Sequence, residues 1–489
     1  MDGITKVLEF SGTKNMKARI TVTETYSATK NSSDITVAVD LLSTGYYGYV
    51  YYLGGNVAVD GDDLVTMSST IGDYNVYIDK KNSYCPIRGD NGSPWKVSGI
   101  KHDPDGAKSI TVSFSVKGFT GDGKGASGFV VEGSSLVALT HIPRESTIGA
   151  TDANIGSVSM IAVSRKNAAY THSIRYTFGE ASGYIKEDGT RSSTEVKMDA
   201  ASIPFAIPTS FYAQIPNKKS AVCTLVCKTY SGSTQIGDSK STTFVITAAE
   251  SLNAPQVTGE VEDINPDTLA LTGDKNKFIR YYSDALCTIA ATARNEATIK
   301  SKSIDGVSVS GSTRTINGMA KEGVTFKAVD SRGYASEVSV PVDLIPYIPL
   351  TCVASGGRKS PTDGTAELTV KGNYYNGSLG GTNNSLTLQY KQGNGALVSV
   401  NPVVSGNAYT ATIPLTGLDY TKSFTFTIVA TDKVTSATQT AEIGKGIPTF
   451  DWGENDFVFH VPVNVGDSLT VEGTTITGDQ LARLIAMLG

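Results

Sequence analysis

The sequence predicts an all-β chain: a jelly-roll-like N-terminal sandwich, then tandem immunoglobulin-like β-sandwiches, then a short C-terminal strand-plus-helix association segment. Three observations support this prediction. Apolar and polar residues alternate with a period of two in many short stretches, and Gly, Asn and Asp separate these stretches. One closing phrase also recurs at intervals close to the length of a small sandwich domain.

The recurring phrase occupies residues 223–232, 324–333 and 424–433. In each copy an alternating strand ends at a polar or acidic residue, a turn follows, and a second polar strand begins. Tyr230, Asp330 and Asp432 occupy equivalent turn positions, spaced by 100 and 102 residues. A repeat of this length indicates a string of small domains. We therefore expect function to come from what the string presents and not from one deep active site.

The repeats and the joints between them predict five segments. Residues 1–146 are too long for one immunoglobulin-like unit, so a jelly-roll-like sandwich is expected there. Residues 139–146 read as a linker strand, and residues 345–349 as a stiff joint bracketed by prolines. The predicted segments are the sandwich 1–146, the immunoglobulin-like sandwiches 147–250, 251–346 and 347–445, and the oligomerisation or anchoring segment 446–489.

The last residues carry the only convincing helical pattern of the sequence. Leu481, Leu484, Ile485 and Leu488 fall on one helical face. A helix of about ten residues is marginal alone, so this face needs something to pack on. Self-association and docking on the fourth sandwich are both open at this point.

Composition excludes some functions. The chain of 489 residues has 42 Lys and Arg against 47 Asp and Glu, a formal net charge of −5. This balance argues against nucleic acid and gives no reason to expect attraction to anionic lipid. No apolar stretch has the length of a membrane span, and the first residues show no signal-peptide pattern. We expect synthesis in the cytosol and no membrane insertion.

The five cysteines show no zinc-site spacing. Cys223 and Cys227 lie four residues apart on one predicted strand, so they share a face but are too far apart to form a disulfide. Free, mostly buried thiols are expected. No bound cofactor or metal is predicted.

The search for catalytic motifs finds none. The four histidines stand in different contexts, and the sequence contains no G-x-S-x-G, H-E-x-x-H or P-loop pattern. A Ser-His-Asp arrangement assembled in space stays open. The Gly-rich residues 118–128 fit a mobile loop better than a phosphate site, because no helix follows. The acidic clusters 60–63 and 103–105 fit turn chemistry, with a weak Ca²⁺ site as the alternative.

Residues 46–52 contain five tyrosines and are the best binding candidate. Strand alternation sends Tyr47, Tyr49 and Tyr51 to one face, where exposed rings could stack on sugars. The alternative is a strand that is buried on both faces or covered by a neighbouring subunit. Trp95 is a second candidate for a glycan contact.

Several short phrases resemble a known family. Residues 139–146 read Leu-Thr-His-Ile-Pro-Arg-Glu-Ser and resemble the L-T-x-I-P-R-x-S junction of tail and minor structural proteins of siphophages that infect Gram-positive bacteria. Residues 170–179, 211–216, 229–237 and 446–463 are also similar to that family. The resemblance spans most of residues 100–465 and is weakest in residues 466–489. It offers no catalytic residues to carry over.

The resemblance implies a virion protein of the tail tip, a fibre or a similar surface appendage, with a role in host attachment. Several weak sites on one homotrimer or other homo-oligomer would gain avidity, with host surface glycan and other virion proteins as partners. One alternative is a purely architectural head-fibre, collar or baseplate scaffold. Another is a cell-wall glycoside hydrolase.

The terminal helix leads to a first test. Deleting residues 466–489 should convert an oligomer to a monomer, because the apolar face of Leu481, Leu484, Ile485 and Leu488 is lost. Light scattering measures the mass. A truncated chain with the same mass as the full chain would exclude an oligomerising role for this segment.

Overall fold

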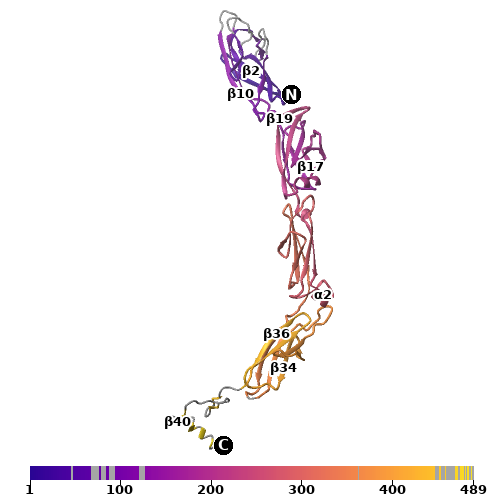
Figure 1. The fold of residues 1–489 in the computed structure, drawn as a ribbon. Coiled ribbons are helices and arrows are strands. Elements are labelled where there is room, and N and C mark those ends of the chain that lie inside the picture. The colour runs from indigo at the N-terminus through magenta and orange to yellow at the C-terminus, as the bar shows by residue number, and fades with distance from the viewer. Residues whose placement is uncertain are drawn as a thin grey trace. The chain divides into compact units, whose positions relative to one another are not determined.

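The computed structural model describes residues 1–45, 48–67, 76–78, 84–87, 94–120, 127–361 and 363–446. In the C-terminal segment it describes 451–452, 457–458, 468–471, 474–477, 479–480, 482–483 and 486. Regular structure in these residues is almost entirely β-strand, which confirms the predicted all-β class. The chain forms two compact units, Met1–Asn253 and Ala254–Gly489 (Figure 1).

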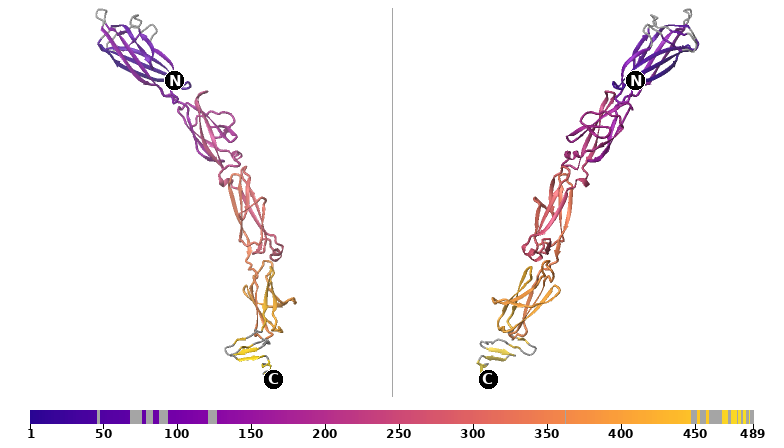
Figure 2. Two further views of the ribbon diagram at one scale, coloured as in Figure 1. Left: turned by 60° about the vertical axis from the view of Figure 1, so that its left-hand side comes forward. Right: turned by 90° about the vertical axis from the view of Figure 1, so that its right-hand side faces the viewer.

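The first unit begins with a sandwich of two five-stranded sheets, whose layers are visible in Figures 1 and 2. Its strands are β1 (Asp2–Ser11), β2 (Met16–Ser27), β3 (Ser32–Ser43), β4 (Gly48–Val59), β5 (Asp62–Met67), β6 (Val76–Ile78), β7 (Cys85–Pro86), β8 (Trp95–Lys101), β9 (Ser109–Thr120) and β10 (Ser127–Ala138). One sheet has the order β1-β2-β3-β7, with β8 also paired to β3. The other has the order β10-β9-β4-β5, with β6 paired to β4.

One hydrophobic core fills this first sandwich. Alternation explains it, since every second side chain of β2 and β3 points inward. The register places Ile20 opposite Val39 and Val22 opposite Val37, and all four are fully buried. Burying a side chain of this size contributes about 1.5–3 kcal/mol. A shift of one residue in register would turn the whole set to solvent, so the alternation also fixes the pairing.

A buried carboxylate continues the inward series of β2. Glu24 is only 1% exposed. Its Oε2 accepts hydrogen bonds from Ile4 N (3.1 Å), Thr140 N (2.9 Å) and Thr140 Oγ1 (2.7 Å), and its Oε1 accepts one from Ser33 Oγ (2.5 Å). Burial alone would raise the pKa of Glu24, but the hydrogen bonds from Ser33, Thr140 and Ile4 outweigh it and lower that pKa. The network ties β1 and the chain after β10 to β2.

His102 completes this network. Ser33 Oγ lies 2.8 Å from His102 Nε2, and His102 Nδ1 lies 2.9 Å from the Gly106 carbonyl oxygen. The carbonyl can only accept, so Nδ1 donates. Ser33 donates to the Glu24 carboxylate and contacts His102, so the network runs from Glu24 through Ser33 and His102 to the Gly106 carbonyl oxygen.

The second sandwich completes the first unit. Its strands are β11 (Thr147–Ala150), β12 (Ala153–Asn154), β13 (Val158–Ser164), β14 (Thr171–Phe178), β15 (Ala181–Ile185), β16 (Arg191–Ser192), β17 (Ser202–Ala206), β18 (Ser220–Ser231) and β19 (Thr234–Thr247). They form a three-stranded sheet, β11-β13-β17, and a six-stranded sheet, β12-β19-β18-β14-β15-β16. The 3-10 helix η1 (Thr209–Gln214) and the short helix α1 (Glu250–Asn253) follow β17 and β19.

The core of the second sandwich contains two of the cysteines. Cys223 and Cys227 lie on the inner face of β18, and burial raises their pKa to about 12 and about 11. None of the five cysteines forms a disulfide, and Cys85, Cys223, Cys227 and Cys287 are buried, in agreement with the predicted mostly buried thiols.

The second unit begins with a third sandwich. Its elements are β20 (Gln256–Asp263), α2 (Pro266–Thr272), β21 (Lys277–Ile279), β22 (Ala285–Thr292), β23 (Ile299–Ile304), β24 (Val307–Val309), β25 (Thr313–Ile316), β26 (Gly323–Asp330), β27 (Ala335–Pro341) and β28 (Asp343–Ile345). The sheets have the orders β20-β22-β25 and β24-β23-β26-β27, with a parallel pair β21-β28 beside them.

The expectation of a single convincing helix, at the C-terminus, is wrong, because α2 is another. Asn265 caps it, and its side chain accepts hydrogen bonds from Asp267 N (3.0 Å) and Thr268 N (3.4 Å). Pro266 takes the first helical position, and Gly273 ends the helix with a left-handed φ of 67°. All three boundary signals can be read in the sequence.

The fourth sandwich has two four-stranded sheets, β29-β30-β34-β33 and β32-β31-β35-β36. Their bounds are β29 (Val353–Arg358), β30 (Ala366–Asn373), β31 (Thr387–Gln392), β32 (Val398–Val400), β33 (Val403–Ser405), β34 (Ala408–Leu415), β35 (Phe424–Thr431) and β36 (Ser436–Ile443). Two short hairpins follow, β37 (Asp451–Trp452) with β38 (Phe457–Val458), and β39 (Ser468–Val471) with β40 (Thr474–Thr477).

Helical backbone follows β40, at Asp479, Gln480, Ala482, Arg483 and Ala486. Its start is a capping box, in which Thr477 N donates to Gln480 Oε1 (3.0 Å) and Gln480 N donates to Thr477 Oγ1 (3.4 Å). The predicted contact residues Leu481, Leu484, Ile485 and Leu488 lie outside the described residues, so the association role stays a prediction. The helices that the structure describes are all too short or too polar to span a bilayer.

The recurring phrase is confirmed as one structural feature. In each copy it forms the antiparallel hairpin β18-β19, β26-β27 or β35-β36. Tyr230, Asp330 and Asp432 lie at the end of the first strand of the hairpin, and all three are buried. Asp330 Oδ1 accepts a hydrogen bond from Tyr334 N (2.8 Å), and Asp432 Oδ1 accepts two from Val434 N and Thr435 N (both 2.8 Å). The carboxylates therefore close the turns.

Within the first unit, the linker between the sandwiches is buried in a small hydrophobic cluster. We call the cluster of Ala28, Ile142, Tyr170 and Ile236, with Tyr26 beside it, the first joint. Tyr170 donates from its hydroxyl to Pro143 O (2.9 Å), and Arg144 Nη1 donates to Ala28 O (2.8 Å). Arg144 thus fixes the linker to the first sandwich, and Tyr170 fixes it to the second.

The second unit contains a comparable second joint, made of Ile279, Ile345, Tyr347 and Leu379, with Leu271, Tyr282, Tyr375 and Val434 around them. Tyr347 lies in the linker that the sequence predicts to be stiff because of its prolines. Its buried ring packs edge-on to Tyr282 at 5.2 Å, and its hydroxyl donates to Asp432 Oδ2 at 2.9 Å. Burial and the Asp432 carboxylate raise the pKa of Tyr347. A side-chain anchor therefore orders this linker together with the prolines.

The Glu24 network leads to a prediction about acid stability. The folded pKa of Glu24 is lower than its ordinary value of 4.5, so its stabilisation is fully present above about pH 4.5 and is lost as the pH falls below it. Glu24→Gln should destabilise the first sandwich at pH 7 by about 2–4 kcal/mol and flatten its acid dependence. Denaturant unfolding followed by Trp95 fluorescence, in a Trp452→Phe background, measures both. Glu132→Gln, on the exposed side of β10, is the control.

The second joint leads to another prediction. Tyr347→Phe removes the hydroxyl donor to Asp432 and should cost about 1–3 kcal/mol locally. Hydrogen exchange measured by mass spectrometry should then show faster exchange in residues 345–350 and 432–435. Tyr420→Phe, at an exposed ring, should leave exchange there unchanged. Equal protection in both variants would mean that the hydroxyl does not hold the linker.

Candidate functional site

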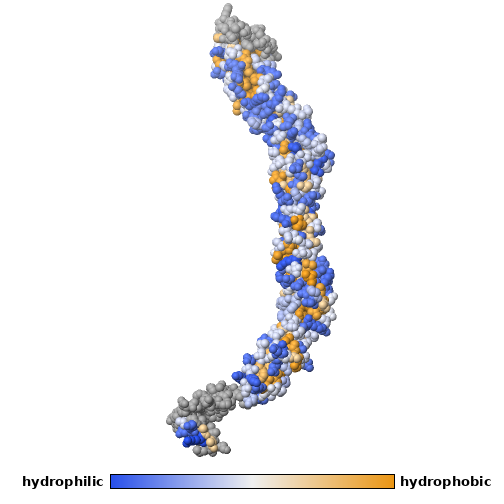
Figure 3. Space-filling view, in the orientation of Figure 1, coloured by the Kyte–Doolittle hydropathy of each residue, from blue (hydrophilic) through white to orange (hydrophobic). Residues whose placement is uncertain are grey.

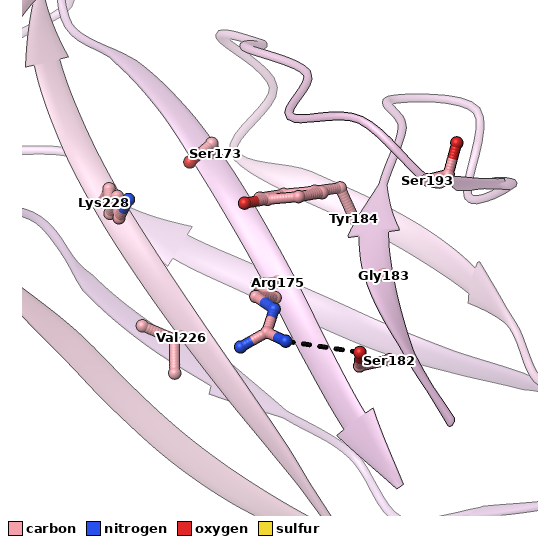
Figure 4. Close-up of a pocket in the computed structure, with 8 residues that line it drawn as sticks. All are labelled: Ser173, Arg175, Ser182, Gly183, Tyr184, Ser193, Val226 and Lys228. Carbon is pink, nitrogen blue, oxygen red and sulfur yellow. Dashed lines mark hydrogen bonds between the residues drawn. The ribbon is translucent and has the colours of Figure 1, made fainter. Parts of the chain in front are cut away.

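A shallow polar groove of about 480 Å³ lies on the second sandwich. Figure 4 shows the eight residues that line it: Ser173, Arg175, Ser182, Gly183, Tyr184, Ser193, Val226 and Lys228. They come from β14, β15 and β18 of the six-stranded sheet and from the chain after β16. Side chains of these strands alternate between the core and the groove: Ile174 and Tyr176 belong to the core, while Ser173 and Arg175 line the groove.

The strand register fixes the spacing of the groove residues. Arg175 lies opposite Tyr184 of β15 on one side and opposite Val226 of β18 on the other. Ser173 lies opposite Lys228, so Lys228 and Arg175 are diagonal neighbours on one face. Such neighbours are about 7–8 Å apart, within reach of two long cationic side chains. In Figure 4 the Tyr184 ring reaches from β15 toward β14, between Ser173 and Arg175.

One wall of the groove is the chain after β16, and Glu195 holds it against the sheet. Ser173 Oγ donates to Glu195 Oε1 at 2.5 Å, and the Tyr230 hydroxyl donates to the same oxygen at 2.7 Å. These two hydrogen bonds, from Ser173 and then Tyr230, lower the pKa of Glu195. Lys197 Nζ lies 3.8 Å from the centre of the Tyr230 ring and donates to Gly232 O.

A glycine allows the edge strand to approach. Gly183 of β15 lies opposite Tyr176 of β14. A Cβ on Gly183 would lie 2.9 Å from the Ser192 carbonyl oxygen. Any other residue would push β16, and with it the wall, away from the sheet.

Both charged residues that line the groove are cations. Arg175 Nη2 donates to Ser182 Oγ at 3.3 Å, and within the described part of the chain no carboxylate lies within 4.0 Å of its guanidinium. Lys228 Nζ has Glu195 at 3.9 Å, a distance too long for a hydrogen bond. The groove therefore presents unsatisfied donors and positive charge on a chain whose net charge is negative.

The predicted tyrosine platform lies only partly within the described residues. Tyr47 is outside them, and the backbone of Tyr49 and Tyr51 belongs to β4. The ladder places Tyr49 opposite Tyr77 and Tyr51 opposite Phe119, which are 53% and 43% exposed. Trp95 begins β8 and is half-buried against the first core. The structure does not bring Trp95 or these tyrosines to the groove, and their glycan contacts stay a prediction.

The residues considered for catalysis and metal binding have structural partners. The Ser33, His102 and Glu24 side chains do meet, but all three are buried, and Ser33 bridges the other two. Asp105 Oδ1 accepts from Ala107 N (2.9 Å), two residues on, as turn chemistry predicts. Asp60 Oδ1 instead accepts from Thr111 N of β9 (2.7 Å). Across the described ranges, no three His, Cys, Asp or Glu side chains gather at one point.

A second hollow, of about 340 Å³, lies on the fourth sandwich among Tyr390, Gln392, Val398, Pro414 and Phe426. Its lining includes one cation, Lys391. It lacks the paired cations of the groove and offers less to a charged ligand.

Sequence reasoning did not find the groove. Residues 172–178 show the alternation of a strand, but the pattern Ser173-x-Arg175 is ordinary for such a strand. The signal lies in three strands at once, since β14, β15 and β18 each place polar or cationic residues on the same face. Only their pairing brings these residues together.

Solved structures and one family model match this chain. The structures include the complex of Dpr2 Ig1-Ig2 with DIP-Theta (13% identity, 61% of this chain and 98% of that chain, TM-score 0.25). A three-Ig fragment of titin has 11% identity, coverage of 61% and 99%, and a TM-score of 0.27. The eight N-terminal Ig domains of Down Syndrome Cell Adhesion Molecule have 12% identity, coverage of 88% and 61%, and a TM-score of 0.22. Because these TM-scores are all below 0.5, the likenesses carry no argument about fold or function.

No curated protein matches the chain in sequence. One family model does match, over residues 94–395, and its description is "Siphovirus protein of unknown function". The match begins in β8 and runs through the second and third sandwiches into the fourth. Because it covers more than half of the chain, this protein belongs to that family of siphovirus proteins (DUF859).

Proposed function

We propose that the chain is a non-enzymatic structural protein of the siphovirus particle. It would belong to a tail tip, fibre or similar surface appendage and contribute to attachment to a Gram-positive host. Membership of a siphovirus family supports the link to the particle. The protein would be made in the host cytoplasm and assembled into virions together with other virion proteins.

The observation that carries this proposal is the pair of buried joints. In each unit the linker between two sandwiches has its own hydrophobic cluster and side-chain hydrogen bonds. Linkers that are buried and hydrogen-bonded in this way restrain the two sandwiches that they connect, which suits display on a particle. The two described hollows are open and shallow, which suits weak contacts better than enclosed chemistry.

Attachment would be multivalent. Weak sites on several copies of the chain gain avidity, because the second contact becomes intramolecular. The terminal segment, through Leu481, Leu484, Ile485 and Leu488, would supply association into a homotrimer or other homo-oligomer. Tyr47, Tyr49, Tyr51 and Trp95 remain candidate contacts with host surface glycan.

A purely architectural role is the second candidate, and the fourth sandwich carries an observation that favours it. The edge strands β32 and β33 and the residue before β32 expose Leu397, Val398, Val403 and Val404, with Val403 72% exposed. Exposed apolar edges commonly mark contacts with other proteins. Figure 3 shows hydrophobic residues gathered in separate areas among hydrophilic ones on the face it presents. A head-fibre, collar or baseplate part could use such areas to bind its neighbours.

Labelling of purified particles tests the proposal. Gold-labelled antibody against residues 147–250 should mark a surface appendage in electron micrographs, and the isolated chain should bind host cells. It should release no reducing ends from host wall polysaccharide. Label on the particle without cell binding would favour the architectural role. Absence of the chain from particles, or release of reducing ends, would contradict the proposal.

A further inference from the structure

We propose that the groove on β14, β15 and β18 binds an anionic carbohydrate chain, whose sugar or polyol units carry phosphate or carboxylate groups. This deepens the proposed attachment role and rests on it for its biological meaning. The binding itself depends only on the groove.

Charge is the first argument. Arg175 and Lys228 are the two charged residues in the lining, and they are diagonal neighbours on one sheet face. Among the described residues, the Arg175 guanidinium has one hydrogen bond, the long one to Ser182. A guanidinium offers five N–H donors in a planar fork that matches phosphate and carboxylate oxygens, so most of its capacity is unused. One anionic group placed between Arg175 and Lys228 would satisfy both cations.

The hydrogen bonds of Glu195 are the second argument. A nearby carboxylate of the protein would normally pair with the cations of such a groove. Glu195 is instead held by Ser173 and Tyr230, which both donate to the same oxygen, and it lies 3.9 Å from Lys228. Its role is to fasten the wall. The Arg175 guanidinium is therefore left for a ligand from outside, and Lys228, which forms a long ion pair with Glu195, adds positive charge beside it.

The hydroxyl groups and the ring are the third argument. Ser182, Ser193 and Tyr184 give the lining three hydroxyls, which suit the alternating donors and acceptors of a polyhydroxyl chain. Ser173 is buried and donates to Glu195. Tyr184 adds a ring on which a sugar can stack. The groove is open along the sheet, so a chain can pass through it and does not need to end there. A small free anion would use the cations but leave the hydroxyls and the ring without a role.

The test uses the full chain and ligand-observed NMR titration with three probes. They are a polyol phosphate oligomer, a polyuronate oligosaccharide, and neutral dextran of similar length. Both anionic probes should bind and dextran should not. Binding should weaken as salt rises to about 1 M, because the contacts are partly exposed. If only one anionic probe binds, the anionic group of the ligand is identified.

Two matched double variants locate the site. Arg175→Gln with Lys228→Gln should weaken binding by about tenfold or more, as the loss of charge-assisted hydrogen bonds predicts. Lys166→Gln with Lys218→Gln removes two exposed cations of the same sandwich and should leave binding unchanged. Arg175→Lys keeps the charge but loses the fork, and should give an intermediate affinity. Thermal unfolding checks that each variant is folded.

The outcomes separate the groove from the attachment role. Equal binding of dextran, equal loss in both double variants, or no binding of either anionic probe at millimolar concentration would overturn the groove proposal. If the Arg175 and Lys228 variant no longer binds the anionic probes but still binds host cells, ligand binding by the groove stands and its role in attachment is overturned. If the chain is absent from particles while the groove binds as described, the proposed function falls and the groove proposal stands.

Discussion

A buried polar group must find a partner, and this constraint organises the chain at the ends of its strands. Each repeat closes with a polar residue that β-pairing carries into a buried position: Tyr230, Asp330 or Asp432. Leaving such a group unpaired costs about 1–3 kcal/mol, so each residue has at least one hydrogen-bond partner. In Asp330 this partner satisfies Oδ1, while Oδ2 has no partner among the described residues. In the fourth sandwich Asp432 uses one oxygen to close its own turn and the other to hold Tyr347 and Asn384. The same carboxylate therefore completes a hairpin and fastens the linker.

The second sandwich uses the equivalent position for a different purpose. Tyr230 donates to Glu195, and this contact, with that from Ser173, holds the wall of the groove. The wall contributes Ser193, and the sheet contributes the cations and Tyr184. A position that serves the joint in one repeat thus serves a surface in another. Domains of one fold acquire separate roles in this way, because the core fixes the frame and the polar residues at its rim are free to vary.

The first sandwich meets the same constraint inside its core. Glu24 occupies an inward position of β2, and a carboxylate there is tolerated only because Ile4, Thr140 and Ser33 satisfy it and His102 lies beyond Ser33. Thr140 belongs to the segment that leads to the second sandwich. The network therefore fixes the end of the first sandwich where the first joint begins, which links stability of the core to order in the linker.

The sequence by itself determined the β class, the repeat, the free thiols and the closing hairpins, because period-two alternation and turn residues act over a few neighbours. It also contained the boundary signals of α2, namely Asn265, Pro266 and Gly273, but these stand among residues with strand patterns. Only the tertiary structure decided the groove, the joints and the Glu24 network. Arg175, Tyr184 and Lys228 meet through the pairing of three strands, and Tyr347 meets Asp432 across 85 residues. Such contacts depend on register and on which groups remain unsatisfied after the core forms, and neither can be read from one strand at a time.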